Sequence, residues 1–195
     1  MTKSIMIVGV GGQGTLLASR ILGNVLIRQG YDVKVSEVHG MAQRGGCVVS
    51  HVRAGDQVFS PMIPLKQADI IIGFEPAEAV RCLPYLKDGG TVIVNRKAVK
   101  PVASMLAAGD YDGEKMLAYL KERVKKLRIV DGEDVCRQCG SAKVLNIALL
   151  AAAAETGCIG ITPEELAEAV KQKLPEKFHS VNCNAIAVVC GKEIQ

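Results

Sequence analysis

A glycine-rich turn directly after a short apolar run is the feature that most constrains the fold of this chain. Ile5–Val8 is uninterrupted apolar sequence, and Gly9-Val-Gly-Gly-Gln-Gly14 follows it at once. Beyond the turn, Leu, Ile and Val recur with helical spacing from Leu16 to Leu26, and Gly30 ends this predicted helix. A buried strand, a tight turn and an amphipathic helix, in that order, are typical of the first unit of a parallel α/β sheet.

The rest of the chain continues this alternation with one interruption. Cys47–Arg53 and Gln57–Ser60 are β-rich runs joined by Ala54-Gly55-Asp56, which predicts an antiparallel hairpin. The other predicted strands are Asp32–Val38, Ala68–Phe74, Thr91–Asn95 and Leu127–Val130, and the predicted helices are Glu78–Leu86, Glu114–Lys126, Ala142–Thr156, a helix opened by Thr162-Pro-Glu-Glu165, and Asn182–Cys190. We therefore expect one α/β domain over residues 1–195, a three-layer, Rossmann-like open sheet that is mostly parallel with an antiparallel hairpin excursion.

The composition argues against several classes of function. Hydrophobic residues make up 49% of the chain and aromatic residues 4%, so the core is expected to be aliphatic. The net charge of +4 comes without a basic run interleaved with aromatics, so no nucleic-acid partner is expected. The Ala-rich run Ala142–Ala154 carries Lys143 and Asn146 and falls short of the ~20 apolar residues that a bilayer requires. It predicts a buried helix and no membrane contact.

The seven cysteines are expected to be free thiols in a reducing cytoplasm, because their number is odd and Ile5–Val10 is too short for the apolar segment of a signal peptide. Cys136 and Cys139 form one CxxC pair, but no further ligands follow at a spacing that would complete a zinc or iron–sulfur site. No metal site is predicted. The pair precedes a helix start expected at Ser141, where the thiol pKa would fall. A thiol-redox module stays open as an alternative to structural thiols.

The glycine turn is a candidate anion site. Gly9, Gly11 and Gly14 fit G-x-G-x-x-G, and the helix that follows offers unpaired N–H groups at its N-terminus. The turn residues considered for ligand or anion binding are Gly9, Gly11, Gly12, Gln13 and Gly14. A nicotinamide dinucleotide would also need an acid ~20 residues later, at the end of the second strand. Glu37 stands near that position but leads into a polar segment instead of a helix, so a stand-alone NAD(P)-binding oxidoreductase is the alternative interpretation.

That polar segment, Glu37-Val-His-Gly-Met-Ala-Gln-Arg-Gly-Gly46, places varied chemistry where the second strand ends. Arg44 could hold a carboxylate or phosphate through bidentate contacts or could pair with Glu37, and Gln43 is a polar companion. His39 could relay a proton or could simply hold the turn. No residue is assigned to catalysis. The residues expected to shape the site are Glu37, His39, Gln43 and Arg44, with Gly45 and Gly46 permitting close approach.

Two more histidines lack a visible partner. His51 alternates within its predicted strand and is expected at the surface or an interface, and His179 follows Phe178 near the end of the chain. Nothing near either residue completes a catalytic site, so structural roles are favoured.

The glycine turn and the polar segment resemble the gamma-type subunits of 2-oxoacid:ferredoxin oxidoreductases, and most of all the small (beta) subunit of indolepyruvate:ferredoxin oxidoreductase. The residues that carry the resemblance are Gly9–Gly14, Glu37–Gly46 with the strand Val48–Arg53, Ala68-Asp-Ile-Ile-Ile-Gly-Phe-Glu75, Asn146 and Thr162-Pro-Glu-Glu-Leu166. The likeness spans nearly the whole chain. Members of that family often have Gly in the helix after Asn146, where this chain has Ala151 and Ala152, which is a difference in packing.

The resemblance implies a subunit that is inactive alone. The complex would oxidatively decarboxylate an aryl 2-oxoacid such as indolepyruvate to an acyl-CoA and pass electrons to ferredoxin. Thiamine diphosphate, Mg²⁺ and the iron–sulfur clusters would belong to a large (alpha) partner subunit, with CoA also used by the complex. This chain would bind no cofactor by itself and would shape the site beside the large subunit. Its apolar docking face is expected to allow a homodimer when the partner is missing.

Overall fold

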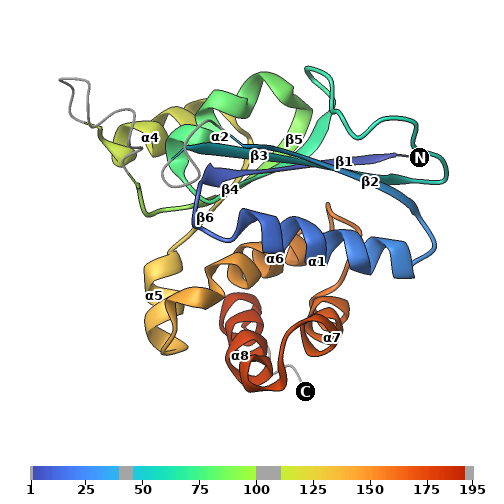
Figure 1. Cartoon of the computed structure of the whole chain (residues 1–195). Coiled ribbons are helices and arrows are strands. Elements are labelled where there is room, and N and C mark those ends of the chain that lie inside the picture. The colour runs from blue at the N-terminus through green and yellow to red at the C-terminus, as the bar shows by residue number, and fades with distance from the viewer. Residues whose placement is uncertain (1, 40–45, 100–110, 192–195) are drawn as a thin grey trace.

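The computed structural model describes residues 2–39, 46–99 and 111–191, and it shows an α/β fold with helices on both faces of a six-stranded sheet (Figure 1). The strands are β1 (Lys3–Val10), β2 (Asp32–His39), β3 (Cys47–Gly55), β4 (Ala68–Gly73), β5 (Leu86–Asn95) and β6 (Lys126–Val130). The helices are α1 (Thr15–Arg28), α2 (Pro76–Cys82), α4 (Gly113–Arg123), α5 (Gly132–Gln138), α6 (Leu145–Glu155), α7 (Pro163–Lys173) and α8 (His179–Cys190). Short 3-10 turns cover Leu83–Tyr85, Ala142–Val144 and Glu176–Phe178.

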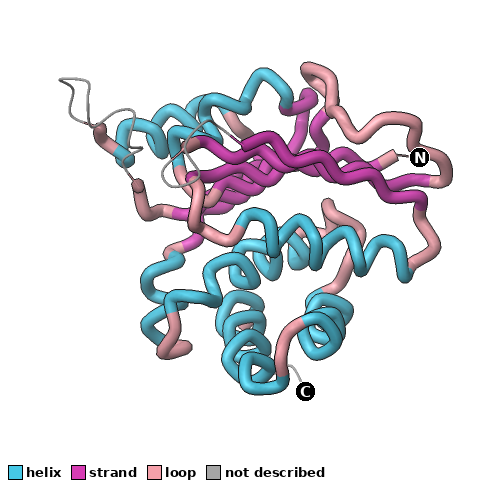
Figure 2. The backbone as a smooth tube through the Cα atoms, in the orientation of Figure 1, coloured by secondary structure: helices cyan, strands magenta, loops and turns pink. Residues whose placement is uncertain are grey.

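The sheet has the strand order β2-β3-β1-β4-β5-β6 and forms one continuous layer (Figure 2). β1, β4, β5 and β6 are parallel, and β3 is antiparallel to both of its neighbours, β1 and β2. Ile5 of β1 stands opposite Val52 on one side and Ile70 on the other. The predicted α/β class and the mostly parallel sheet with an antiparallel excursion are therefore confirmed.

The predicted hairpin partner of β3 is wrong. Gln57–Ser60 is not a strand, and the chain leaves the sheet after Gly55. Both edges of β3 are already paired with β1 and β2, so no ladder position is left for a further strand. The backbone N–H of Val58 donates instead to Asp32 Oδ2 at 2.9 Å.

Two apolar cores lie on opposite faces of the sheet. The smaller core lies under α2 and α4, and the larger core is shared by α1, α5, α6, α7 and α8 on the other face (Figure 1). Every residue from Asn146 to Ala154 in α6 is buried, because α6 lies between the sheet and the outer helices α7 and α8. This confirms the prediction of a buried helix. No helix in the described part of the chain is long and apolar enough to cross a bilayer.

Side-chain caps fix where several helices begin. Thr162 and Glu165 form a capping box at the start of α7, the helix predicted to open there, with each side chain accepting a backbone N–H of the other residue. Asp112 and Asp131 cap α4 and α5 through their side chains alone, which accept backbone N–H groups of the first turn. The start of α1 differs, because its N-cap is Gly14, which offers no side chain.

His51 is buried, so its predicted place at the surface is wrong. Its side chain is 4% exposed, and its Nδ1 accepts the backbone N–H of Ile63 at 3.3 Å. The ring also meets Tyr85 edge-on, with centroids 6.2 Å apart. Burial lowers the pKa of His51, which fits a neutral ring that anchors the loop after β3. His179 is likewise structural, since its Nε2 lies 2.7 Å from the carbonyl of Leu174.

Two glycine substitutions should change stability in opposite directions. A Cβ on Gly9 would lie 2.7 Å from Gln13 Oε1 and 2.8 Å from Phe74 Cβ, so Gly9→Ala should lower the free energy of unfolding by about 1–3 kcal/mol. A Cβ on Gly23, inside α1, would make only ordinary contact with Val35 at 3.5 Å. Gly23→Ala should therefore raise stability by about 0.5–1 kcal/mol through helix propensity. Urea unfolding of both variants checks this pair, and equal effects would contradict it.

Candidate functional site

A chain of amide groups joins the carboxyl ends of four parallel strands. The backbone N–H of Val10 donates to Gln13 Oε1 at 2.7 Å, and Gln13 Nε2 donates to the carbonyl of Phe74 at 3.3 Å. The same carbonyl accepts from Asn95 Nδ2 at 3.3 Å, and Asn95 Oδ1 accepts from the N–H of Gly132 at 3.2 Å. We call these contacts the amide chain. They hold the ends of β1, β4, β5 and β6 in one rigid rim, where α/β sheets bind their ligands.

The glycine turn begins at this rim with a backbone suited to an anion. Gly12 and Gly14 have φ of 100° and 86°, in the left-handed region that favours glycine. The N–H of Gly11 donates to the carbonyl of Gly46 at 2.8 Å, so the structure brings these two predicted residues together. The side chain of Gln13 is engaged within the turn, by its hydrogen bonds to Val10 and Phe74. No side chain caps α1, which leaves its first-turn N–H groups as the donors for an anion.

Two glycines of the rim allow contacts that a side chain would disturb. A Cβ on Gly14 would lie 3.3 Å from Nδ2 of the buried Asn146, and a Cβ on Gly132 would lie 2.6 Å from Asn95 Oδ1. The turn therefore packs directly on the start of α6, and Gly132 packs directly on the amide chain.

The polar segment is only partly described. Glu37 is half-buried, and its Oε1 accepts the hydroxyl proton of the buried Ser19 at 2.8 Å. His39 pairs with Val48 through its backbone at the end of β2. The predicted site residues Gln43, Arg44 and Gly45 lie outside the described residues.

The position of Glu37 differs from that of the acid in a dinucleotide-binding domain. In such a domain the strand that carries the acid lies next to the first strand. Here β3 separates β2 from β1, so Glu37 stands one strand further from the glycine turn. Its carboxylate is also engaged by Ser19 of α1. The alternative interpretation as an NAD(P) site therefore loses the acid that it needs.

Glu75 is a buried acid at the rim that was not among the residues predicted for the site. Its Oε1 accepts the hydroxyl proton of Tyr111, and its Oε2 accepts the N–H of Glu78 at 3.0 Å and so caps α2. The side chain is fully buried, and burial raises its pKa to about 7, although backbone N–H donors oppose the shift. The available signal was a carboxylate placed directly after the apolar run of β4.

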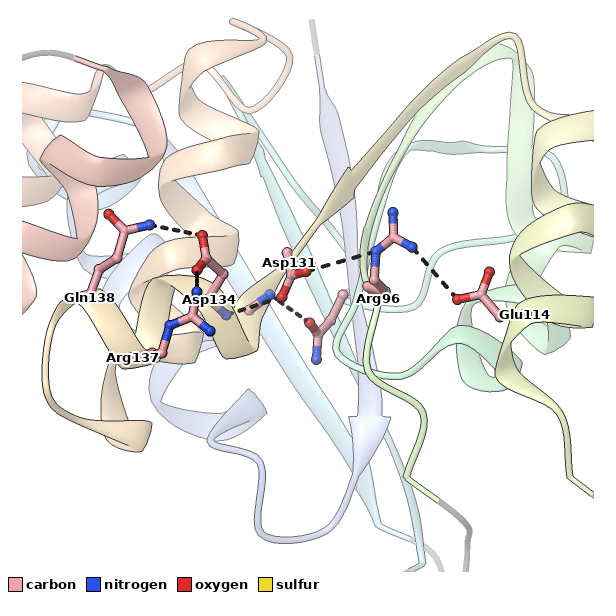
Figure 3. A network of polar contacts seen from close by, with 8 residues as sticks. Arg96, Glu114, Asp131, Asp134, Arg137 and Gln138 are labelled. Atoms are coloured by element: carbon pink, nitrogen blue, oxygen red, sulfur yellow. Dashed lines mark hydrogen bonds and ion pairs between the residues drawn. The ribbon is translucent and has the colours of Figure 1, made fainter.

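Arg96 extends the rim on the side of β5 and β6. Its Nε lies 4.0 Å from Asp131, and its Nη1 lies 3.7 Å from Glu114, so it stands between the starts of α5 and α4 (Figure 3). The same arginine and Tyr111 line a hollow of about 460 Å³. These ion pairs are largely exposed and contribute little stability, so the guanidinium stays available to an anion in the hollow.

The CxxC pair does not have the environment predicted for reactive thiols. Cys136 lies within α5 and Cys139 is its C-cap residue, so the pair stands at the C-terminal end of a helix and not at its start. The helix dipole there disfavours a thiolate, and burial raises the pKa of both thiols. The predicted fall in pKa is therefore wrong. Among the described residues no group of three or more His, Cys, Asp and Glu could hold a metal ion.

Comparison with known proteins places the chain in a family. The family described as "Pyruvate ferredoxin/flavodoxin oxidoreductase" matches residues 4–194. The chain belongs to this family. Indolepyruvate oxidoreductase subunit IorB of Thermococcus kodakarensis is 36% identical over 98% of this chain and 96% of its own length. The corresponding subunit of Methanothermobacter thermautotrophicus is 34% identical over 95% and 94% of the two chains. The resemblance seen in the sequence is therefore confirmed, and these relatives are subunits of oxidoreductases.

A solved structure supports the fold of this member of the pyruvate ferredoxin/flavodoxin oxidoreductase family. The gamma subunit of keto/oxoacid ferredoxin oxidoreductase from Geobacter sulfurreducens superposes with a TM-score of 0.72 at 24% identity. The match covers 99% of this chain and 97% of the other. The two folds therefore match over almost the whole of both chains.

Glu75→Gln should change how stability depends on pH. The pKa of Glu75 is about 7 in the fold against an ordinary 4.5, so the folded chain holds this proton more tightly. Its contribution to stability is fully present below pH 4.5 and is lost as pH rises through 7, by about 2–3 kcal/mol between pH 5 and pH 8. Glu75→Gln should remove that loss.

Urea unfolding of the chain and of Glu75→Gln at several pH values measures the effect. The pKa of His51 is lowered, so its stability contribution runs the other way, rising with pH, but it is present in both proteins and cancels in the difference. Parallel pH profiles for the two proteins would contradict the assignment.

Proposed function

We propose that this chain is the small subunit of a thiamine-dependent 2-oxoacid:ferredoxin oxidoreductase that acts on indolepyruvate or a related aryl pyruvate. The complex oxidatively decarboxylates the 2-oxoacid to an acyl-CoA and passes the electrons to ferredoxin. The observation that carries this proposal is the similarity to the indolepyruvate oxidoreductase subunit, at 36% identity over 98% of this chain and 96% of that subunit. The chain is proposed to shape the site and to be inactive alone.

The rim supports a role beside the active centre of another subunit. The amide chain makes the carboxyl ends of the strands rigid, and the uncapped start of α1 offers N–H donors to a carboxylate or phosphate. Arg44 is proposed to add bidentate contacts to the same anion. Thiamine diphosphate, Mg²⁺ and the iron–sulfur clusters are proposed for the large subunit, where they supply the carbon and electron chemistry. This chain's part is to bind and orient an anionic group.

The outer edge of β2 supports a docking face near that rim. β2 is an edge strand of the described sheet, so one side of its backbone is unpaired. Val35 and Val38 on this strand are 40% and 50% exposed. Leu17 and Ile27 of α1 add exposed apolar surface on the same side of the sheet as Val35. Exposed apolar side chains beside an open strand suit a protein partner, here the large subunit, and such exposure would favour self-association of the isolated chain.

Co-expression with the large subunit tests the proposed function. The two chains should purify together, and the complex should reduce ferredoxin or a viologen dye when indolepyruvate and CoA are supplied. The isolated small chain should show no such activity and no micromolar binding of NADH or NADPH, measured by nucleotide fluorescence. Activity of the isolated chain with a nicotinamide cofactor would overturn the proposal in favour of the alternative oxidoreductase.

Arg44→Ala should weaken the complex as a catalyst without unfolding this chain. Loss of a charge-assisted bidentate contact is expected to lower kcat/KM for the 2-oxoacid or for CoA by about tenfold or more. Arg28→Ala is the matched control, because Arg28 is exposed at the far end of α1 and contacts Gln172 of α7. Steady-state kinetics of the reconstituted complexes measure both variants. Unchanged kinetics in Arg44→Ala would reject its role.

A further inference from the structure

A second hollow lies at the opposite end of the strands from the rim. It occupies about 690 Å³ between α2, α4 and the start of β5. We call it the basic groove. Its charged lining consists of the five cations Lys66, Arg81, Lys87, Arg123 and Lys125 and the single carboxylate Asp88. Because the whole chain carries a net charge of only +4, positive charge is concentrated in this groove.

Two irregular backbone segments meet at the basic groove. Lys66 has φ of 60° and is the one described non-glycine residue in the left-handed region, and its N–H donates to the carbonyl of Pro84 at 3.0 Å. Across the groove, Leu86 pairs with Ala68 and Thr91 pairs with Ile70, so residues 87–90 bulge out of the ladder. Strained residues and bulges are enriched near functional sites. Here both bring lysines to the same hollow.

The cations of the basic groove are held in place without being fully neutralised. Arg81 is bound by Glu78, and Lys87 is bound by Asp69. The Arg123 guanidinium lies 4.8 Å above the Tyr119 ring, so an aromatic group and not an acid positions it. Lys125 has no acidic partner among the described residues. An anion would therefore meet at least two uncompensated positive charges.

The lining of the basic groove also includes apolar side chains, those of Val80, Leu83, Leu86 and Val124. Tyr119 lines the same groove and is 38% exposed. Apolar and aromatic side chains next to cations match a ligand that has a flat or apolar body and charged phosphates, since base–aromatic stacking and phosphate–lysine contacts act together.

We propose that the basic groove binds a nucleotide-type phosphate ester, of the class of a nucleoside diphosphate. Phosphate oxygens would contact Arg123, Lys125 and the lysines of the two irregular segments, and the base would lie against Tyr119. The size of the groove falls within the ~300–1,000 Å³ of small-molecule sites. The site is independent of the proposed function, because it lies at the other end of the strands from the rim.

Titration of the full chain with ADP, inorganic pyrophosphate and adenosine by calorimetry at low salt tests the proposal. ADP should bind most tightly, pyrophosphate more weakly, and adenosine not measurably. Arg123→Gln with Lys125→Gln should weaken ADP at least tenfold. Lys143→Gln with Lys173→Gln is the matched control, because it removes the same charge from exposed positions on the other helical layer and should change binding less than twofold. CoA also carries a diphosphate. A parallel titration with CoA therefore shows whether the groove binds CoA or a free nucleotide more tightly.

The aromatic contact has its own variant. Tyr119→Leu should weaken ADP about fivefold and pyrophosphate by less, because the ring would contact the base and also positions Arg123, whereas Tyr119→Phe should retain the binding of both. Circular dichroism confirms that each variant is folded. Equal loss of ADP binding in the control pair would show non-specific charge attraction and overturn the proposal. So would the absence of binding by any phosphate compound, including the case in which the groove variants instead lose association with the large subunit.

Discussion

The amide chain at the carboxyl ends of β1, β4, β5 and β6 is the interaction on which the functional rim depends. A parallel sheet holds its strands side by side but leaves the turns beyond them free to differ. Here Gln13 and Asn95 converge on one carbonyl, that of Phe74, and so tie three turns to a common point. Because these groups are buried or half-buried, losing one partner would leave another polar atom unsatisfied. The free-energy cost of an unsatisfied buried polar atom therefore keeps the amide chain intact.

The antiparallel strand β3 decides what kind of site the rim can form. By separating β1 from β2, it moves Glu37 away from the glycine turn and brings Gly46, at its own start, against Gly11. The start of α1 thus stands next to the glycine turn without a capping side chain, but the turn lacks the neighbouring acid that a dinucleotide ribose requires. This arrangement fits the proposed role beside the active centre of a larger chain. β3 also leaves β2 as an open edge beside exposed valines, where such a chain could dock.

Burial shifts the pKa values of several titratable groups in this fold. Glu75 caps α2 under the rim and holds Tyr111, and its raised pKa is the consequence of complete burial beside few compensating charges. His51, on the face covered by α2 and the loop after β3, is kept neutral for the same reason. The thiols of Cys136 and Cys139 follow this trend, since partial burial at a helix C-terminus disfavours their charged forms. Desolvation is the largest cause of the pKa shift at each of these four groups.

Local sequence determined the elements and their chemistry, because strand and helix periods, glycine turns and caps are properties of neighbouring residues. Ile5–Val8, the turn to Gly14, the capping box at Thr162 and the buried helix after Asn146 were all readable in this way, as was the family. Only the tertiary structure decided which strands are neighbours, since backbone hydrogen bonds between distant strands leave no mark on local periodicity. That is why the partners of β3, the burial of His51, the pKa of Glu75 and the convergence of Gln13 and Asn95 on Phe74 appeared only in three dimensions.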